Sequence, residues 1–307
     1  MSRIKIERIP CSHDDHQVHI ELPSDYHELA HAADDVVRTL VAPYPKTRRL
    51  YDILLDDPRV NAHWDLANYT AVMKLGYNDH GPVHAQAATA SAMQITTALV
   101  EADVPLDVVA SGAGLLDDAM LVVLAGAMLH DIGNQLHRLN HVGYGVILAQ
   151  PILERLLPTI YPDPEQHQLI QSFILSTIAT HDCDPPPLTI EGGIVAVADG
   201  TDMTKGRGRM SFDLGRIDIH SVSALSIEEV HIRRGKRTAV DIEVVMSNSA
   251  GIFQVQETLV RKLLKTPLKD HVTVRACTTP EQGVLDQRII HCVALQDGYL
   301  QVDDRGG

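Results

Sequence analysis

The spacing of apolar residues along the chain predicts a helical body that covers about two thirds of its length. Between about residues 24 and 203, apolar positions recur every three or four residues, as in helices with one or more buried faces. Proline, glycine and Asp-Pro pairs interrupt this periodicity. A first helix is predicted from Ser24, as N-cap, to just before Pro43. Further helices are predicted at about 47–55, 60–75, 82–102, 117–130, 138–157, 165–180 and 189–203.

The two ends of the chain have a different pattern. Residues 1–22 alternate polar and apolar positions, which predicts one or two short strands that can pair as a hairpin. After about Arg209, a β-β-α-β order predicts a small α+β module. Its strands are expected at about 227–232, 239–246, 271–277, 289–295 and 299–302, and its helix at about 253–264.

The predicted fold class is therefore a mainly α-helical bundle with a smaller C-terminal α+β domain. We divide the chain into N-terminal strands and helices (1–75), a central helical domain (76–210) and the C-terminal domain (211–307). The C-terminal domain carries no cluster of chemically active residues. It is interpreted as a dimerisation or regulatory module, with a purely structural cap as the alternative.

Composition restricts the classes of partner. The net charge of −14 argues against non-specific binding to nucleic acid or anionic membranes, which needs a basic face. The longest apolar run, Ala119–Leu129, is shorter than the roughly 20 residues of a membrane span. The first residues lack the apolar core of a signal peptide. Four scattered cysteines without a CxxC pair are interpreted as reduced thiols, which predicts a cytoplasmic protein.

The doublet His130-Asp131 ends the longest apolar run and is the strongest chemical signal of the chain. Adjacent helical residues point about 100° apart, so the two side chains can share a site only at a helix end. There His130 can bind one metal ion, and Asp131, with two oxygens, can bridge to a second. Gly133 is predicted to stop the helix.

Further imidazole and carboxylate groups follow the same helical segments. This mixture of ligands holds Zn, Mn, Fe or Ni in catalytic sites. Asp199 lies late in an apolar segment, where a carboxylate is costly to bury unless it is paired or bound to metal. The candidate metal ligands are His84, His130, Asp131, His141, His181 and Asp199.

This order of residues resembles the HD-domain superfamily of metal-dependent phosphohydrolases. The matching positions are His84, the doublet His130-Asp131 and Asp199, within roughly residues 75–210. The two further histidines, His141 and His181, stand where HD-GYP-type and cyclic-nucleotide phosphodiesterase domains have theirs. The resemblance implies a divalent transition metal (Mn, Fe, Ni or Zn) and a metal-activated hydroxide that attacks phosphorus. Two ions per chain are expected; if only His84, His130, Asp131 and Asp199 bind, one ion catalyses the same class of reaction.

Three departures predict an outlying branch of this superfamily. No GYP motif follows His181; Asp184-Pro185-Pro186-Pro187 stands there instead. Asn134 occupies a place where a lysine is common in HD-GYP domains, and Asp182 follows His181 where that group often has paired histidines. Cyclic di-GMP is therefore not the expected substrate.

Several other polar residues are candidates for catalysis or substrate binding. His80 is the rival first ligand, and otherwise a substrate contact, a proton carrier or a helix-start residue. The sequence leaves four roles open for Asp182: a further metal ligand, a partner that orients a ligand, a proton carrier or a solvated acid. Arg138 can hold a phosphate oxygen, as can Lys205 and Arg207 in a glycine-rich basic segment that is otherwise a solvated linker.

These features predict an enzyme, a phosphodiesterase or phosphomonoesterase that hydrolyses a phosphorylated small molecule or nucleotide. Two alternatives stay open: a non-catalytic HD sensor that binds metal or a nucleotide, and a di-iron oxygenase of the HD type. Presence of every candidate ligand favours the enzyme over the sensor. Exposed strand edges in the C-terminal module favour a homodimer.

Overall fold

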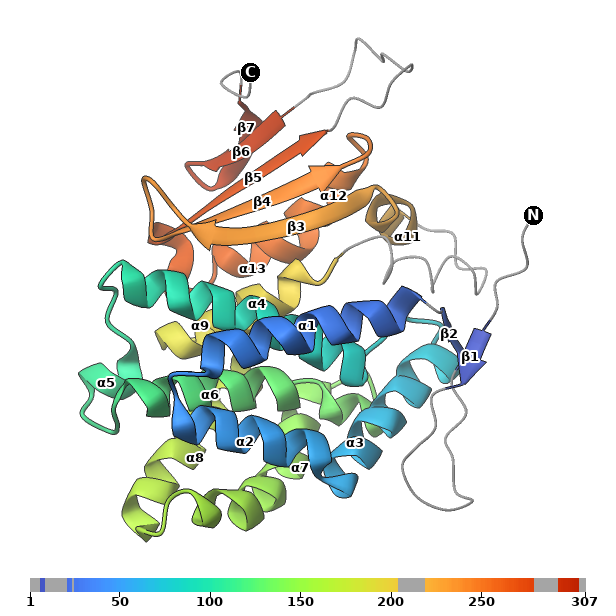
Figure 1. The fold of residues 1–307 in the computed structure, drawn as a ribbon. Helices are drawn as coiled ribbons and strands as arrows, with labels where there is room; N and C mark the ends of the chain where they lie inside the picture. The colour runs from blue at the N-terminus through green and yellow to red at the C-terminus, as the bar shows by residue number, and fades with distance from the viewer. Residues whose placement is uncertain (1–5, 9–20, 24, 204–218, 279–291, 304–307) are drawn as a thin grey trace.

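The structure, a computed structural model, describes residues 6–8, 21–23, 25–203, 219–278 and 292–303. A body of helices forms one part of the molecule, and a five-stranded sheet lies against it at the top of the view in Figure 1. The predicted fold class, a mainly helical domain with a smaller C-terminal α+β domain, is confirmed. The predicted N-cap Ser24 lies outside the described residues.

Each long helix that the periodicity predicts is present, with ends that differ by a few residues. A π-helical segment at Tyr69–Lys74 extends the third helix, and a four-residue helix, α5, was not predicted. The helices of the body are α1 (Asp25–Val41), α2 (Pro45–Asp56), α3 (Pro58–Asn68), α4 (Pro82–Glu101), α5 (Asp107–Ala110), α6 (Leu116–Leu129), α7 (His141–Leu156), α8 (Pro164–Thr180) and α9 (Ile190–Thr201).

Helix α6 is the centre of the helical body. Every residue of Ala119–Leu129 is buried, and α6 packs against α2, α4, α8 and α9. A helix that is apolar on all sides is stable only when neighbours cover it on all sides. Gly126 lets α8 approach closely, since a Cβ atom there would lie 2.1 Å from the Thr177 hydroxyl oxygen. The core thus fixes the position of the end of α6, where the doublet lies.

The prediction that Gly133 stops this helix is wrong. Helix α6 ends at Leu129, and Gly133 lies further on, in a 3₁₀ turn at Ile132–Gln135. A Cβ atom on Gly133 would lie 1.9 Å from the carbonyl oxygen of His141 and 2.4 Å from the amide nitrogen of Gly145. The glycine is therefore required because helix α7 packs its backbone directly against the turn that follows the doublet.

The C-terminal module is a sheet with a helical crossover on one face. Neighbouring strands run antiparallel except for β4 and β5, which are parallel and are joined through the crossover. The strands are β3 (Ile227–Arg234), β4 (Val240–Met246), β5 (Val272–Thr278), β6 (Cys292–Gln296) and β7 (Tyr299–Val302). The crossover consists of α12 (Gly251–Gln254), a π-helical segment (Val255–Val260), α13 (Arg261–Leu263) and a 3₁₀ turn (Pro267–Asp270).

The crossover helices lie between the sheet and the helical body (Figure 1). Two glycines of α9 allow this contact. A Cβ atom on Gly200 would lie 3.0 Å from the carbonyl oxygen of Thr258, and one on Gly193 would lie 3.2 Å from Leu268. Buried apolar side chains of both parts form one continuous core. The predicted domain boundary near residue 210 lies outside the described residues. This boundary and the one near residue 75 both stay predictions.

Short elements complete the described chain. The predicted N-terminal hairpin is present as β1 (Ile6–Arg8), which pairs antiparallel with β2 (Glu21–Pro23). Helix α11 (Ile219–Ala224) precedes the C-terminal sheet. No helix of the described residues is long and apolar enough to cross a membrane.

The prediction of reduced thiols is wrong for two of the four cysteines. Cys277 on β5 and Cys292 on β6 form a disulfide, and they are directly opposite each other in the register of these strands. Cys183 is a free, buried thiol. A separation of 15 residues does not show which strands pair, so the sequence alone could not reveal this bond.

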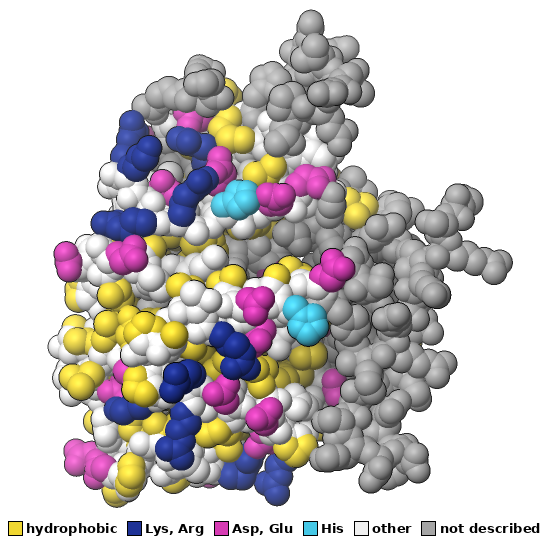
Figure 2. Space-filling model, viewed as in Figure 1, with side chains coloured by type: hydrophobic (Ala, Val, Ile, Leu, Met, Phe, Trp, Pro, Cys, Tyr) yellow, Lys and Arg dark blue, Asp and Glu magenta, His cyan; other side chains and the backbone are white. Residues whose placement is uncertain are grey.

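Basic side chains gather over the sheet in the upper part of Figure 2. A hollow of about 840 Å³ on this module is lined by five of them, Arg233, Arg234, Lys236, Arg237 and Arg275. Four carboxylates, Asp241, Glu243, Asp297 and Asp303, line the same hollow. Opposite charges therefore almost balance there, and this region is not a strongly basic surface.

Candidate metal centre

The six predicted metal ligands lie together in one cluster at the ends of five helices. His84 is in the first turn of α4, and His130 and Asp131 follow the last residue of α6. His141 is the first residue of α7, and His181 follows the last residue of α8. Asp199 is in the last turn of α9. Helix packing thus brings residues more than 100 positions apart in the chain into one site.

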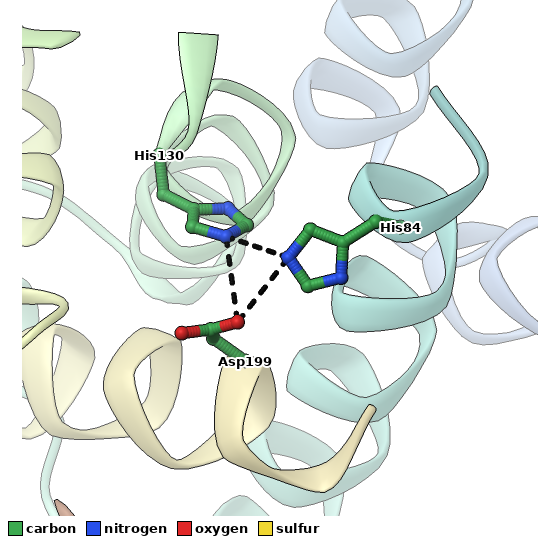
Figure 3. A group of neighbouring side chains, drawn as sticks. All are labelled: His84, His130 and Asp199. Carbon is green, nitrogen blue, oxygen red and sulfur yellow. Dashed lines mark hydrogen bonds and ion pairs between the residues drawn. The ribbon is translucent and has the colours of Figure 1, made fainter. Parts of the chain in front are cut away.

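Three of these side chains form what we call the inner group: His84, His130 and Asp199 (Figure 3). The Nε2 atoms of the two histidines are 3.1 Å apart. The Oδ1 atom of Asp199 lies 3.2 Å from Nε2 of His84 and 3.7 Å from Nε2 of His130. All three ligand atoms therefore converge on one point.

A second set, which we call the outer group, consists of His141, His181 and Asp182. Here too the two Nε2 atoms are 3.1 Å apart. The Asp182 carboxylate lies 3.4 Å from Nε2 of His141 and 3.9 Å from Nε2 of His181. Of the several roles that the sequence left open for Asp182, this geometry favours that of a ligand.

Asp131 lies between the two groups and faces one with each oxygen. Its Oδ2 atom is 3.4 Å from Nε2 of His84 and 3.5 Å from Nε2 of His130. Its Oδ1 atom is 3.5 Å from Nε2 of His141 and 3.7 Å from Nε2 of His181. The arrangement is that of a carboxylate that can bridge two ions.

Hydrogen bonds of the histidine rings determine which nitrogen faces the cluster. The Nδ1 atoms of His130, His141 and His181 donate to the backbone carbonyl oxygens of Ala127, Arg138 and Ile178, at 2.7, 3.0 and 2.8 Å. Carbonyl oxygens only accept, so each Nδ1 carries a proton and each ring directs its Nε2 atom into the cluster.

His84 is oriented in the same way by a carboxylate, since its Nδ1 lies 2.6 Å from Oδ2 of Asp202. In each group, two Nε2 atoms therefore face each other across 3.1 Å. Two such nitrogen atoms repel at this distance unless a proton or a metal ion lies between them.

The spacing of the ligand atoms also fits a metal ion. Two atoms about 2.0–2.2 Å from a common ion are about 2.8–3.6 Å apart at tetrahedral or octahedral angles. The separations within the inner group, 3.1 to 3.7 Å, are close to this range. The donor set and its spacing thus fit divalent transition metals in both groups.

The charges of the cluster shift the pKa values of its carboxylates. Burial opposes ionisation of Asp131, but the charges of His130 and His80 and bonds to His181 and His84 hold its pKa well below the usual range. Burial of Asp199 is likewise outweighed, mainly by Lys262, and its pKa is also well below that range. These acids are therefore ionised and able to bind cations.

The outer group shows the same balance. Burial raises the pKa of Asp182, but the charges of His181, Lys262 and His141 lower it to about 2. Burial lowers the pKa of His141 to about 4, against the opposing effect of Asp131. Burial also lowers that of His181, but Asp131 and Asp182 more than compensate, and its pKa is raised. In the absence of metal, a proton on His181 can take the place of a cation.

Four residues that were not predicted as parts of the site hold these ligands in place. Asp202 orients His84, and Asp79 accepts a hydrogen bond from the backbone N–H of His84 at 2.8 Å. Asn134 donates to Oδ1 of Asp131 at 2.8 Å. Lys262, from the C-terminal module, contacts both Asp199 and Asp182. Asp202 lies one helical turn after Asp199, a spacing that could have identified it, whereas nothing in the sequence points to Lys262.

The other predicted site residues have different positions. The Nη1 atom of Arg138 is 3.1 Å from Nε2 of His141 and 3.8 Å from Oδ1 of Asp131, at the edge of the outer group. His80 is buried, with its ring centre 5.9 Å from that of His84, and its Nδ1 donates to the carbonyl oxygen of Asn78. His80 is not in any of the groups of potential metal ligands that the described residues form. Lys205 and Arg207 lie outside the described residues.

Solvent reaches the cluster from the side of the outer group. The side chains of Asp182 and Arg138 are 34% and 33% exposed, whereas those of His84 and His130 are at most 1% exposed. The cluster is therefore most accessible to solvent beside Asp182 and Arg138.

Comparison with known proteins agrees with this site. The family model of the HD domain matches residues 105–204, a segment that contains every candidate ligand except His84. A protein of Methanocaldococcus jannaschii, named uncharacterized protein MJ1020, is 40% identical over 240 residues, which are 78% of this chain and 92% of the relative. No solved structure matches the chain significantly. The match to the family model, the similarity to this relative and the His-Asp centre show that the chain belongs to the HD-domain superfamily. Members of this superfamily are generally metal-dependent phosphohydrolases.

Proposed function

We propose that this protein is a phosphohydrolase with a dinuclear metal centre, and that it cleaves a phosphoester bond of a nucleotide-like substrate. One observation carries the proposal: each oxygen of Asp131 faces a different pair of histidines, Oδ2 the pair His84 and His130 and Oδ1 the pair His141 and His181. A centre of this form is suited to two cations that share one carboxylate.

The residues that would hold the ions follow from the two groups. The inner group with Oδ2 of Asp131 would hold one ion, and the outer group with Oδ1 of Asp131 would hold the other. Nitrogen and carboxylate ligands suit Mn, Fe, Ni or Zn. When bound, such ions lower the pKa of a shared water molecule and neutralise charge on phosphoryl oxygens.

The protein keeps these ligands in place before the ions bind. Bonds from the backbone and from Asp202 fix the histidine rings, and Asn134 fixes the central carboxylate. Such outer partners set the orientation and basicity of metal ligands. Fixed ligands reduce the reorganisation needed during the reaction, which is a major source of catalysis in buried sites.

Arg138 is the group that we assign to the substrate. Its guanidinium lies beside the outer group and is partly exposed, so it can hold an oxygen of an incoming phosphoryl group. Lys205 and Arg207 are further candidates for such contacts. His80, close behind His84, is proposed to carry a proton.

We further propose that the protein acts as a homodimer. A location in the cytoplasm stays a prediction from the sequence, and the Cys277–Cys292 disulfide removes its argument from reduced thiols. The outer edge of the C-terminal sheet supports the dimer, since Tyr299 and Val302 on β7 are 73% and 56% exposed. A partner that covers this edge would pair its open backbone groups. Light scattering of the purified full-length chain measures the mass that decides this point.

The experiment that tests the function uses bis-p-nitrophenyl phosphate and p-nitrophenyl phosphate as substrates. Metal-stripped protein is reloaded in turn with Mn, Fe, Ni, Zn and Mg, with and without O₂. We expect hydrolysis that requires metal, does not require O₂ and disappears in Asp131→Ala. The matched control is Asp35→Ala, at an exposed acid on α1. Bound metal without turnover of either substrate would contradict a general phosphoesterase and favour a sensor, and O₂-dependent turnover would favour an oxygenase.

A further inference from the structure

A lysine of the C-terminal module reaches into the metal centre. Lys262 belongs to α13, on the crossover between β4 and β5, and lies outside the segment that matches the HD family. Its side chain is 15% exposed, and its Nζ atom contacts Asp199 of the inner group and Asp182 of the outer group. This ammonium group thus connects both halves of the centre.

The approach of α9 to the crossover explains how the lysine comes to this position. Gly200, directly after Asp199, leaves room for the backbone of Thr258 and Leu259. Leu259, Val260 and Leu263 are fully buried, so packing fixes the crossover against α9. The position of Lys262 is therefore set by the core and does not depend on a flexible surface segment.

The ammonium group uses all of its hydrogen-bonding capacity in the centre. It donates to the carbonyl oxygen of His181 at 3.0 Å, to Oδ1 of Asp182 at 3.3 Å and to Oδ2 of Asp199. An ammonium group has three donors, and here each has its own acceptor. A surface ion pair rarely reaches this degree of satisfaction, because long exposed side chains keep their freedom.

Lys262 binds one oxygen of each carboxylate, Asp199 and Asp182, and the other oxygen of each lies close to a histidine. In Asp199, Oδ2 contacts Lys262, and Oδ1 lies 3.2 Å from Nε2 of His84. In Asp182, Oδ1 contacts Lys262 and lies 3.9 Å from Nε2 of His181, and Oδ2 lies 3.4 Å from Nε2 of His141. Lys262 thus holds one oxygen of each acid and thereby fixes the direction of the other oxygen.

We propose that Lys262 is a positioning residue of the metal centre, which makes the C-terminal module an integral part of that centre and not only a cap or a dimerisation surface. The inference rests on the proposed dinuclear centre. Lys262 holds one oxygen of Asp199 and one oxygen of Asp182, and so fixes the orientation of both carboxylates that would bind the ions. A purely structural ion pair between the two parts is the alternative to be tested.

The test is a calorimetric titration of the metal-free full-length chain with Mn²⁺, together with the visible spectrum of the Co²⁺-loaded protein. We expect Lys262→Met to weaken Mn²⁺ binding about 10–100-fold, the usual effect of removing an outer partner of metal ligands. The Co²⁺ spectrum should change as well, because freed carboxylates alter the coordination. Lys262→Arg keeps the charge and should recover part of the affinity.

The matched control is Lys269→Met, at an exposed lysine in the 3₁₀ turn that follows the same crossover helix. It should leave both readouts unchanged. A structural ion pair would lower the unfolding temperature of Lys262→Met and leave the Mn²⁺ affinity and Co²⁺ spectrum as in the wild type; that result would overturn the inference alone. Wild-type protein that binds no Mn²⁺ would overturn the proposed centre and, with it, this role. If Lys262→Met does not fold, the Co²⁺ spectrum of Lys262→Arg decides, since a wild-type spectrum there would contradict precise positioning by the lysine.

Discussion

The inner and outer groups of the centre have the same ligand chemistry and different surroundings. Each has two histidines 3.1 Å apart, one aspartate of its own and one oxygen of Asp131. In the inner group the most exposed side chain, Asp199, is 15% exposed, whereas Asp182 in the outer group is 34% exposed. Identical ligands can thus serve one site that is closed to solvent and one that is open to it.

These different surroundings indicate different roles for the two groups. The inner group is enclosed by α4, α6 and α9, and its His84 is fixed by a second carboxylate, Asp202. The outer group borders Arg138, the group assigned to the substrate. We therefore expect the inner ion to bind more tightly and the outer ion to exchange and to face the substrate. Each prediction below tests this difference.

The largest effect should come from Asp131→Asn, because this residue is shared by both groups. Loss of its charge should weaken Mn²⁺ binding at both sites by more than about 100-fold, beyond the usual effect of an outer partner. Titration calorimetry measures this, with Asp35→Asn as control. If one site kept its wild-type affinity, Asp131 would not be a bridge.

Removal of one histidine from each group should separate the two sites. His141→Ala should leave about one tightly bound ion per chain after dialysis, since the inner group keeps all of its own ligands. His84→Ala should leave less than one, because the outer ion exchanges. Elemental analysis of dialysed protein gives these numbers. Equal losses in the two variants would remove the proposed asymmetry.

A smaller effect, confined to the outer group, is expected from Gly133→Ala. The added methyl group collides with the backbone of α7 at His141, so the turn and helix must separate. Overpacking of this kind costs about 1–3 kcal/mol of unfolding free energy. Urea unfolding measures the loss, and metal titration should show the outer site weakened more than the inner one. Gly143→Ala, which meets only the side chain of Asn140, is the control and should cost less.

The smallest effect concerns a carboxylate remote from the metal centre, and it provides a baseline. Asp57 caps α3 and binds Arg155. Burial raises its pKa, but the bonds from Arg155, Val60 and Arg59 outweigh this and lower it below its ordinary value of 3.8. Its stabilising effect is therefore complete above that value and is lost as the pH falls through the lower folded-state pKa.

Asp57→Ala should accordingly cost about 0.5–2 kcal/mol at pH 7, the usual value for an N-cap. The cost should decline as the pH falls below the ordinary pKa of 3.8. Urea unfolding of the wild type and the variant at a series of pH values on both sides of this value measures the decline. A difference in unfolding free energy that stayed constant throughout the series would show that the charge of Asp57 contributes nothing.

Local patterns were sufficient to predict the elements and most residues of the candidate metal centre. Apolar periodicity placed the helices, because each helix of the body buries one or more faces in a common core. The order of His84, His130-Asp131, His141, His181 and Asp199 identified six residues that the fold brings together. These residues lie at helix ends, where a short motif specifies both the side chain and its position.

Such local patterns could not predict contacts between segments that are distant in the sequence. Lys262 enters the centre only because the crossover packs on α9, and no motif marks it. The Cys277–Cys292 bond depends on the pairing of β5 with β6. Gly133 was assigned to helix termination, although its actual requirement comes from the backbone of α7. Each of these depends on which elements are neighbours in space.

The most direct test of the dinuclear centre is anomalous diffraction from crystals of the full-length protein loaded with Mn²⁺. A dinuclear centre should give two peaks about 3.5–4 Å apart, the usual separation in two-metal sites, with one oxygen of Asp131 next to each. The inner peak should keep its height after back-soaking in metal-free buffer, while the outer peak declines. A single peak, or two peaks that do not share Asp131, would contradict it.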